Sequence, residues 1–395
     1  MTHFIDVLLV GCSMAALVPA LTLAAQVVAA MLARNAYKNR ATSQRGRVAI
    51  IVPAHNETRM LPGTLAALFR QIGGGDRIVV VADNCSDDTA QVAETLGAEV
   101  VIRNNDVHRG KGYAMARGVE YLARHCPPDV VVFVDADCLV AQGAIQKLTS
   151  AALSTGRPVQ ARYLLQAPPR AGLGVRVSEF AVRLKNHIRP SGGDLLAMPC
   201  GLTGSGMAFP WSTVRSVELA TSNIVEDLAL GINLTLMGHS PIYCADALVT
   251  SPLPLAESSH TNQRKRWEQG HLATIVRKVP TLLISAVRQQ SWKCFAAALD
   301  LLVLPLTLLL LVQSALLVVD LLWTGQGGSG WPLSLQIVSL LLISGSISIA
   351  WHMHGRDLLT VRDFFYVPLY VMKKIPMYWR IGMGDRVGWT RTERD

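Results

Sequence analysis

The sequence predicts an α/β fold with a mostly parallel sheet, joined to three membrane-spanning helices. From Val48 onwards, strand-like runs alternate with helical stretches, and polar loops follow the strands. Half of the 395 residues are apolar and only 16% are charged, which is unusual for a soluble protein. The net charge of +9 would suit nucleic acid, but the basic residues flank apolar runs and do not alternate with aromatic residues. We therefore expect a membrane protein and no nucleic-acid partner.

The first apolar run extends from Val7 to Ala33. It can cross a bilayer core of about 30 Å, which takes roughly 20 residues. A cleaved signal peptide is the competing interpretation, but the residues before the run lack Lys and Arg. The basic residues follow the run instead, at Arg34, Lys38, Arg40, Arg45 and Arg47. The positive-inside rule then predicts an external amino terminus and a cytoplasmic segment after the span.

After this span, short β-branched runs are separated by helical stretches. The runs expected as strands are Val48–Val52, Arg77–Ala82, Glu99–Ile102, Val130–Val134 and Gln160–Leu165. The stretches expected as helices are Thr58–Gln71, Asp87–Leu96, Lys111–Arg124 and Gln142–Ser154. This alternation is typical of parallel sheets covered by helices. Farther along, Gly192 with Gly193 and the stretch Gly201–Gly206 predict loops that meet a ligand.

Two further apolar spans, Phe295–Trp323 and Trp331–Trp351, are joined by an uncharged loop. Basic residues precede the first and follow the second, so we expect a cytoplasmic carboxyl terminus. The preceding segment Glu257–Arg288 is polar and predicted to be helical. Asp300 and Asp320 are expected to face the interface or a neighbouring helix, because a lone acid in lipid is costly.

The stretch Phe364–Lys374 combines aromatic anchors with a lysine pair and predicts an interfacial amphipathic helix. A fourth, short span is the alternative, which Pro368 and the lysines disfavour. The seven cysteines lack metal-finger spacing and are expected to be reduced, and His55, His108 and His271 are expected as ordinary loop or surface residues. The expected organisation is a transmembrane helix in 1–34, a cytoplasmic α/β domain in 45–255, interfacial helices in 256–293, two transmembrane helices in 294–352, and an interfacial helix with a cytoplasmic tail in 353–395.

Two carboxylates end the most apolar predicted strand, Val130–Val134. Asp135 and Asp137 are one residue apart, and so lie on the same side of the chain where a parallel sheet meets its ligand. Paired hard oxygen ligands at such a place suit Mg²⁺ or Mn²⁺. An exposed turn without a ligand is the alternative.

Three more polar loops follow predicted strands and converge on the same edge. They are Pro53–Glu57, Asp83–Thr89 and His108–Gly112. Each has a simpler explanation, since Asp87 or Ser86 could cap a helix and Lys111 could be a solvated first-turn residue. Their common placement favours one ligand site.

These motifs resemble, in order and spacing, those of the membrane-bound members of glycosyltransferase family 2, which include cellulose, chitin and hyaluronan synthases and, more loosely, ceramide glucosyltransferases. The resemblance covers roughly Val48 to Gly270. The motifs that carry it are Pro53–Glu57, Asp83–Thr89, Arg109–Gly112, Asp135 with Asp137, Gly204–Gly206, Glu226-Asp227 and Gln263–Trp267. The resemblance implies a GT-A fold that holds a nucleotide-diphosphate sugar across the carboxyl ends of the strands.

The resemblance also implies roles for individual residues. Pro53, Glu57 and Asp83 would line the donor site, with Glu57 and Asp83 on the uridine, and Lys111 would lie near the diphosphate. Asp137 would ligate the metal, with Asp135 beside it on the metal or the nucleotide. Asp227 would be the general base, although a helix cap is its simpler explanation. At the acceptor and diphosphate end the matching residues are Glu226, Gln263, Arg266 and Trp267.

Two observations bear on the acceptor end. Arg266 and Trp267 match the arginine and tryptophan of the Q-x-x-R-W signature, a diphosphate clamp and an acceptor platform in the family, although an interfacial anchor is the alternative. Val225 stands where the family commonly has Thr, which weakens inference about the acceptor.

The function implied is that of an inverting, metal-dependent glycosyltransferase of the bacterial inner membrane. It would transfer a sugar from a UDP-sugar to a lipid-linked acceptor, such as a polyprenyl-diphosphate glycan or a glycolipid, in cell-envelope or exopolysaccharide biosynthesis. Three spans are few for a polymer channel, so a processive β-polysaccharide synthase ranks second unless the subunits of a homo-oligomer share a channel. A non-catalytic membrane scaffold ranks third, because the carboxylates are all present.

Overall fold

The computed structural model describes residues 2–33, 46–221, 225–253 and 257–383. The chain forms two compact units. Within the described residues, the sheet unit comprises 46–168, 197–221, 225–253 and 257–260, and the helical unit comprises 2–33, Pro169–Leu196 and 261–383. The stretch Pro169–Leu196 thus belongs with the apolar helices, although it falls inside the segment expected as one α/β domain. The basic residues from Arg34 to Arg45 lie outside the described part of the chain.

The sheet unit is built on one sheet with the strand order β3-β2-β1-β4-β7-β6-β8-β5. The strands are β1 (Val48–Ala54), β2 (Arg77–Asp83), β3 (Glu99–Arg103), β4 (Val130–Phe133), β5 (Leu139–Val140), β6 (Val159–Gln166), β7 (Met207–Pro210) and β8 (Ile242–Pro252). Strands β3, β2, β1 and β4 are parallel neighbours, as the sequence predicts. The pairs β4 with β7, β7 with β6 and β8 with β5 are antiparallel. The carboxyl ends of the first four strands therefore meet at one edge.

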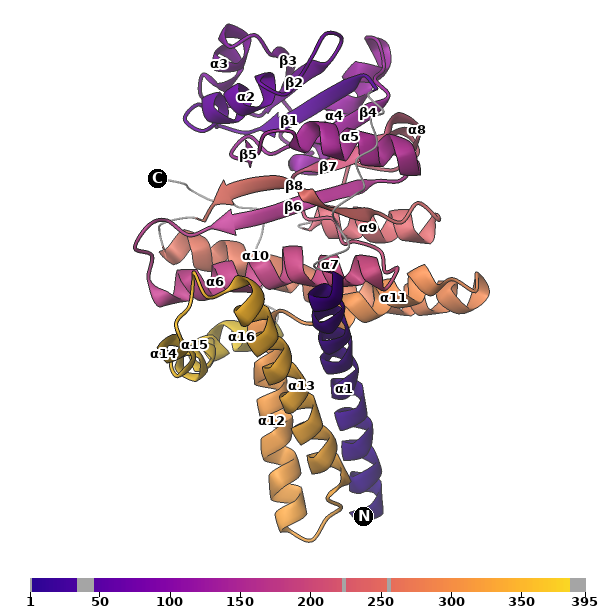
Figure 1. Cartoon of the computed structure of the whole chain (residues 1–395), viewed down its shortest axis with the longest axis vertical. Helices are drawn as coiled ribbons and strands as arrows, with labels where there is room; N and C mark the ends of the chain where they lie inside the picture. Colours follow the sequence, from indigo (N-terminus) through magenta and orange to yellow (C-terminus); the bar gives the residue numbers. More distant parts are fainter. Residues whose placement is uncertain (1, 34–45, 222–224, 254–256, 384–395) are drawn as a thin grey trace. The chain divides into compact units, whose positions relative to one another are not determined.

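Helices cover both faces of this sheet (Figure 1). They are α2 (Leu61–Phe69), α3 (Thr89–Thr95), α4 (Lys111–Arg124), α5 (Ala144–Thr155), α8 (Trp211–Arg215) and α9 (Glu226–Leu236). Buried residues of α2, α3 and α5 share one apolar core with Ile50 and Val52. Those of α4, α8 and α9 share the other core with Ile51 and Val79. Because successive strand residues point to opposite faces, fully buried strands are apolar throughout.

The helical unit contains three helices that are long and apolar enough to cross a membrane: α1 (Thr2–Ala33), α12 (Leu306–Gly325) and α13 (Trp331–His354). The other helices are α6 (Leu173–Arg183), the π-helix η2 (Leu184–Ile188), α7 (Arg189–Leu195), α10 (Glu257–Arg288), α11 (Trp292–Leu302), α14 (Val361–Phe364), α15 (Val367–Met372) and α16 (Ile375–Gly382). Figure 1 shows α6, α7, α10 and α11 running crosswise to the three long helices. This arrangement fits spans joined to helices that lie along a membrane surface.

Polar side chains of the helical unit bond across helices. Arg189 donates to the Asp300 carboxylate at 2.7 Å and to Gln26 at 2.8 Å, and Gln26 also donates to Asp300 at 2.7 Å. Ser13 donates to Asp320 at 3.1 Å. Both aspartates therefore face neighbouring helices, as expected.

Gly192 is not in a ligand-binding loop, contrary to the prediction for Gly192 and Gly193. It lies in α7, where an added Cβ would come within 1.7 Å of the Gln26 carbonyl oxygen of α1. The glycine therefore serves close helix packing.

Two other predictions in this unit are corrected. The predicted span Phe295–Trp323 is broken between α11 and α12, because Pro305 has no N–H to donate to the Leu301 carbonyl. That carbonyl instead contacts Nε2 of His271 at 3.0 Å, and His271 is buried, not a surface residue. Burial and then the charges of Lys185 and Arg189 lower the pKa of His271 to about 4.

The single interfacial helix predicted over Phe364–Lys374 is wrong in detail. The end of α14 and all of α15 lie in this stretch, and a third short helix, α16, begins directly after it. Pro368 and Pro376 lie near the starts of α15 and α16, where a missing N–H costs little. Large apolar side chains are exposed along them, including Phe365 and Trp379.

Candidate functional site

The acidic pair lies in the turn between β4 and β5. Oxygens of Asp135 and Asp137 and the Cys138 sulfur all lie within 4.8 Å of one another. Cys138 is fully buried, and burial raises the pKa of its thiol to about 12. The sulfur therefore remains protonated at neutral pH, and the carboxylates are the available cation ligands.

Neighbouring hydroxyl groups fix the Asp137 carboxylate and the Asp135 backbone. Ser251 of β8 donates to Asp137 Oδ2 at 3.0 Å, and the Asp137 residue is only 7% exposed. The hydroxyl of Ser205 accepts from the Asp135 amide at 3.1 Å and contacts the Cys138 sulfur at 3.2 Å. The turn is thus held by residues from the second half of the sheet, where β6 and β8 are parallel and the other pairs antiparallel, and whose pairing the sequence did not predict.

Lys111, the first residue of α4, lies among several acids. Its ammonium contacts Asp135 Oδ1 at 2.5 Å and donates to the Gly204 carbonyl at 2.7 Å. Burial by itself lowers the pKa of Lys111, but the charges of Asp135, Glu226 and Asp227 outweigh it and raise the pKa. Lys111 is therefore an integral part of the acidic cluster and not a solvated first-turn residue.

Glu226 and Asp227 begin helix α9, and Asp227 Oδ1 accepts from the next amide, of Leu228, at 2.8 Å. Gly204 joins them to the cluster: a Cβ there would lie 3.3 Å from both Asp227 Oδ2 and Lys111 Nζ. Gly204 also has φ of +93°, which favours glycine. Burial and the Asp227 charge raise the pKa of Glu226 to about 7. The structure therefore brings Asp135, Lys111 and the Glu226-Asp227 pair together.

The loops after β1 and β2 contact each other. Asn56 and Asn84 take left-handed backbone conformations, with φ of 54° and 52°. Asn56 accepts from the Ser86 amide at 2.7 Å, and the Glu57 amide donates to the Thr89 hydroxyl at 2.9 Å. Pro53 lies within β1, in register with Val81 of β2. Glu57 thus lies in a loop at the carboxyl end of β1, as predicted, whereas Pro53 belongs to the strand itself, which is two residues longer than predicted.

Asp87 is not the N-cap of α3, which is Asp88, but it lies next to it and holds the start of the helix. Its carboxylate accepts from the Thr89 amide at 3.1 Å and from the Thr58 amide at 3.4 Å. These contacts fix the start of α3 to the loop after β1.

Asp83 is buried and paired with a residue that the sequence reasoning missed. Arg103 donates to Asp83 Oδ1 at 2.5 Å and to the His108 carbonyl, and Asn84 donates to the same Oδ1 at 3.1 Å. In the described part of the chain, Asp83 Oδ2 has no hydrogen bond. Arg103 ends β3 and is in register with Asp83, so the rule that located the other loops also applies to it.

The residues of the Q-x-x-R-W signature belong to the helical unit, on α10. Trp267 is 37% exposed and Arg266 is partly buried. The side chain of Gln263 lies outside the described part. Between them, Arg264 is held by Glu268 at 2.8 Å and by Thr307 of α12 at 2.8 Å.

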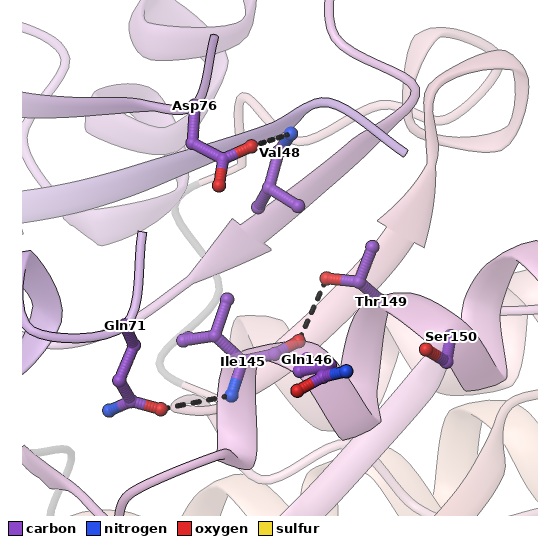
Figure 2. Close-up of a pocket in the computed structure, with 7 residues that line it drawn as sticks. All are labelled: Val48, Gln71, Asp76, Ile145, Gln146, Thr149 and Ser150. Atoms are coloured by element: carbon purple, nitrogen blue, oxygen red, sulfur yellow. Dashed lines mark hydrogen bonds between the residues drawn. The ribbon is translucent and has the colours of Figure 1, made fainter. Parts of the chain in front are cut away.

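A small pocket of about 50 Å³ lies elsewhere on the sheet unit (Figure 2). Its lining includes Val48 and Asp76, at the amino-terminal ends of β1 and β2, where Asp76 accepts from the Val48 amide at 3.0 Å. Gln71 accepts from the Ile145 amide at 3.3 Å. Ligand pockets usually enclose roughly 300 Å³ or more, so this pocket is a gap in the framework.

The donor set at the acidic site fits a divalent cation. Carboxylate oxygens are hard ligands of the kind that Mg²⁺ and Mn²⁺ prefer. In the described cluster, three carboxylates (Asp135, Glu226 and Asp227) act on the single ammonium of Lys111, and Asp137 adds a fourth acid. The excess of negative charge would attract a cation and, through it, phosphates.

Comparisons with known proteins agree with this geometry. The sequence model of the glycosyltransferase like family 2 matches residues 45–270. Over 148 residues, the chain is 36% identical to uncharacterized glycosyltransferases of Mycobacterium tuberculosis and Mycobacterium bovis, a match that covers 36% of this chain and 62% of each relative. A 94-residue stretch is 33% identical to the 4,4'-diaponeurosporenoate glycosyltransferase of Staphylococcus haemolyticus, covering 23% of this chain and 24% of that protein.

A solved structure confirms the fold class. The mannosyltransferase of Pyrobaculum calidifontis, in complex with GDP-Man and Mn²⁺, matches 96% of this chain and 100% of its own, with 16% identity and a TM-score of 0.53. The expected GT-A type of α/β fold is therefore confirmed. Because the family description matches more than half of the residues, this chain belongs to the glycosyltransferase like family 2.

Proposed function

We propose that the chain transfers a sugar from a nucleoside-diphosphate sugar, with inversion, to an acceptor at a membrane surface. The observation that carries this proposal is the acidic cluster at the carboxyl ends of the strands. There Asp135 and Asp137 stand beside Lys111, and the Glu226-Asp227 pair adjoins the same lysine. It combines cation ligands, a phosphate-binding ammonium and a candidate base.

Asp227 is the proposed general base, which takes the proton of the acceptor hydroxyl as that oxygen attacks the anomeric carbon. Its Oδ1 is fixed by the Leu228 amide, which holds the carboxylate at the start of α9. Asp135 and Asp137 would hold Mg²⁺ or Mn²⁺, which neutralises charge on the leaving diphosphate when bound. Lys111 adds a second positive charge on the same diphosphate.

The donor base is proposed to be one that presents an N–H to Asp83. Uracil and guanine carry such a group, and the carboxylate oxygen Oδ2 is the acceptor that remains. A UDP-sugar is the first choice from the family resemblance. A GDP-sugar is the second, favoured by the likeness to a mannosyltransferase in complex with GDP-Man.

The acceptor is proposed to be lipid-linked. Three helices long and apolar enough to span a membrane support a membrane protein. From the positive-inside rule, we propose that the sheet unit and the carboxyl terminus are cytoplasmic and that the amino terminus is external. A relative named for 4,4'-diaponeurosporenoate agrees with an apolar acceptor. In the same proposal, Gln263, Arg266 and Trp267 take the roles implied by their signature. A processive synthase remains the second candidate, because homo-oligomers can share a channel.

The test is transfer of labelled sugar by the full chain in native lipid extract, with Mn²⁺ and a panel of UDP- and GDP-sugars. Solvent-extractable label that is absent with Asp137→Asn would support the proposal and identify the donor. Label in a polymer would favour the synthase. Binding of nucleotide without transfer from any donor would contradict the proposal and favour a scaffold.

A further inference from the structure

Lys111 carries positive charge within the acidic cluster, so the position of its ammonium determines which carboxylate is neutralised. Its ammonium is 2.5 Å from Asp135 Oδ1, and Asp135 is one of the two carboxylates suited to a divalent cation. An ammonium and a dication repel each other strongly when both are held by one carboxylate. Lys111 and the cation therefore compete for Asp135.

The backbone around Lys111 is fixed, while its side chain is long and flexible. A Cβ at Gly112 would come within 2.4 Å of the Leu219 carbonyl oxygen and 3.0 Å of the Thr221 carbonyl oxygen, so the start of α4 is packed tightly against residues 219–221. Lys111 itself carries its charge on a four-carbon stem with several rotatable bonds. The ammonium can therefore change partners without a movement of the helix.

A diphosphate is a stronger partner for this ammonium than one carboxylate. It offers several charged oxygens, each of which can accept a charge-assisted hydrogen bond. The Gly204 carbonyl, which accepts from Lys111 at 2.7 Å, is a neutral partner that is readily given up.

We propose that Lys111 is an exchangeable counterion that couples cation binding to donor binding. Lys111 neutralises Asp135 until a nucleoside diphosphate draws the ammonium onto its phosphates, and Asp135 then becomes available to the divalent cation. The inference rests on the proposed function, since it assumes a diphosphate donor. It adds that the cation binds weakly alone and tightly with the donor.

The test is the affinity of the full chain for Mn²⁺, measured by electron paramagnetic resonance without nucleotide and then with UDP or GDP. Without nucleotide, Lys111→Met should bind Mn²⁺ roughly tenfold more tightly than wild type, because one nearby positive charge is removed. Lys111→Arg keeps the charge and should match wild type. With nucleotide, the gain in Mn²⁺ affinity should be smaller in Lys111→Met than in wild type, since only direct phosphate ligation remains.

Lys147→Met is the matched control, because it removes one exposed lysine from α5, where the ammonium contacts the Asp246 carbonyl at 2.9 Å. It should leave Mn²⁺ affinity unchanged. Thermal unfolding shows that each variant is folded. Mn²⁺ affinity in Lys111→Met that equals or falls below that of wild type overturns the counterion role while the proposed function stands. A wild type that binds neither Mn²⁺ nor nucleotide overturns both.

Discussion

A charge cluster in the helical unit and one in the sheet unit are balanced in opposite ways. In the helical unit, Arg189 meets Asp300 and Gln26, and Arg264 meets Glu268. In the sheet unit, several carboxylates gather around Lys111. Matched charges hold a fold together, whereas unmatched charges cost stability and attract a ligand that completes them. This difference distinguishes the framework from the site. It predicts that removing a charge lowers the stability of the folded chain in the first cluster and raises it in the second.

The largest expected effect on stability is in the helical unit. Arg189→Met would remove the guanidinium that donates to both Gln26 and the Asp300 carboxylate, which costs about 3 kcal/mol. The melting temperature should fall, and Mn²⁺ affinity should not change. Arg189→Lys keeps the charge but cannot donate to both partners as the guanidinium does, so its melting temperature should lie between those of Arg189→Met and wild type. A melting temperature of Arg189→Met equal to that of wild type would contradict the stabilising role of this charge cluster.

Removing charge from the sheet unit should stabilise it. The Glu226 pKa is about 7 in the folded chain against an ordinary 4.5, so its stabilising contribution is present below pH 4.5 and is lost as the pH rises through 7. At about 1.4 kcal/mol per pKa unit, the full loss is on the order of 3 kcal/mol, and coupling to Asp227 makes the observable part smaller.

Glu226→Gln does not titrate and avoids this loss. Its melting temperature should exceed that of wild type by more at pH 8 than at pH 5. An equal difference at both pH values would show that burial of Glu226 carries no such cost.

The smallest expected effect concerns Arg103, a paired charge inside the sheet unit. Because Arg103 fixes Asp83 and the His108 carbonyl, Arg103→Gln should raise the donor KM roughly tenfold, as expected for one charge-assisted hydrogen bond, with kcat nearly unchanged. Arg103→Lys should recover part of the loss. A fall in kcat at constant KM would assign Arg103 to the reaction step instead.

Local patterns predicted the first half of the sheet, because each strand there is a short apolar run with a polar loop behind it. That was enough to locate Asp83, Asp135 and Asp137 at one edge. The second half depends on long-range pairing: Ser251 lies in β8, which is parallel to β6, and Ser205 lies just before β7, which is antiparallel to β4. Both reach the acids through this pairing. Hydropathy alone also did not reveal the helix break before Pro305, because the break is caused by a missing backbone donor and not by a polar residue.

The measurement that tests the central claim most directly is transfer by Asp227→Asn, compared with Asp246→Asn, an exposed acid of β8. A general base contributes roughly a hundredfold to ten-thousandfold, so transfer should fall by that factor while Mn²⁺ and nucleotide binding persist. Asp246→Asn should retain full activity. Transfer by Asp227→Asn within a few-fold of wild type would contradict the assignment of the acidic cluster as the catalytic site.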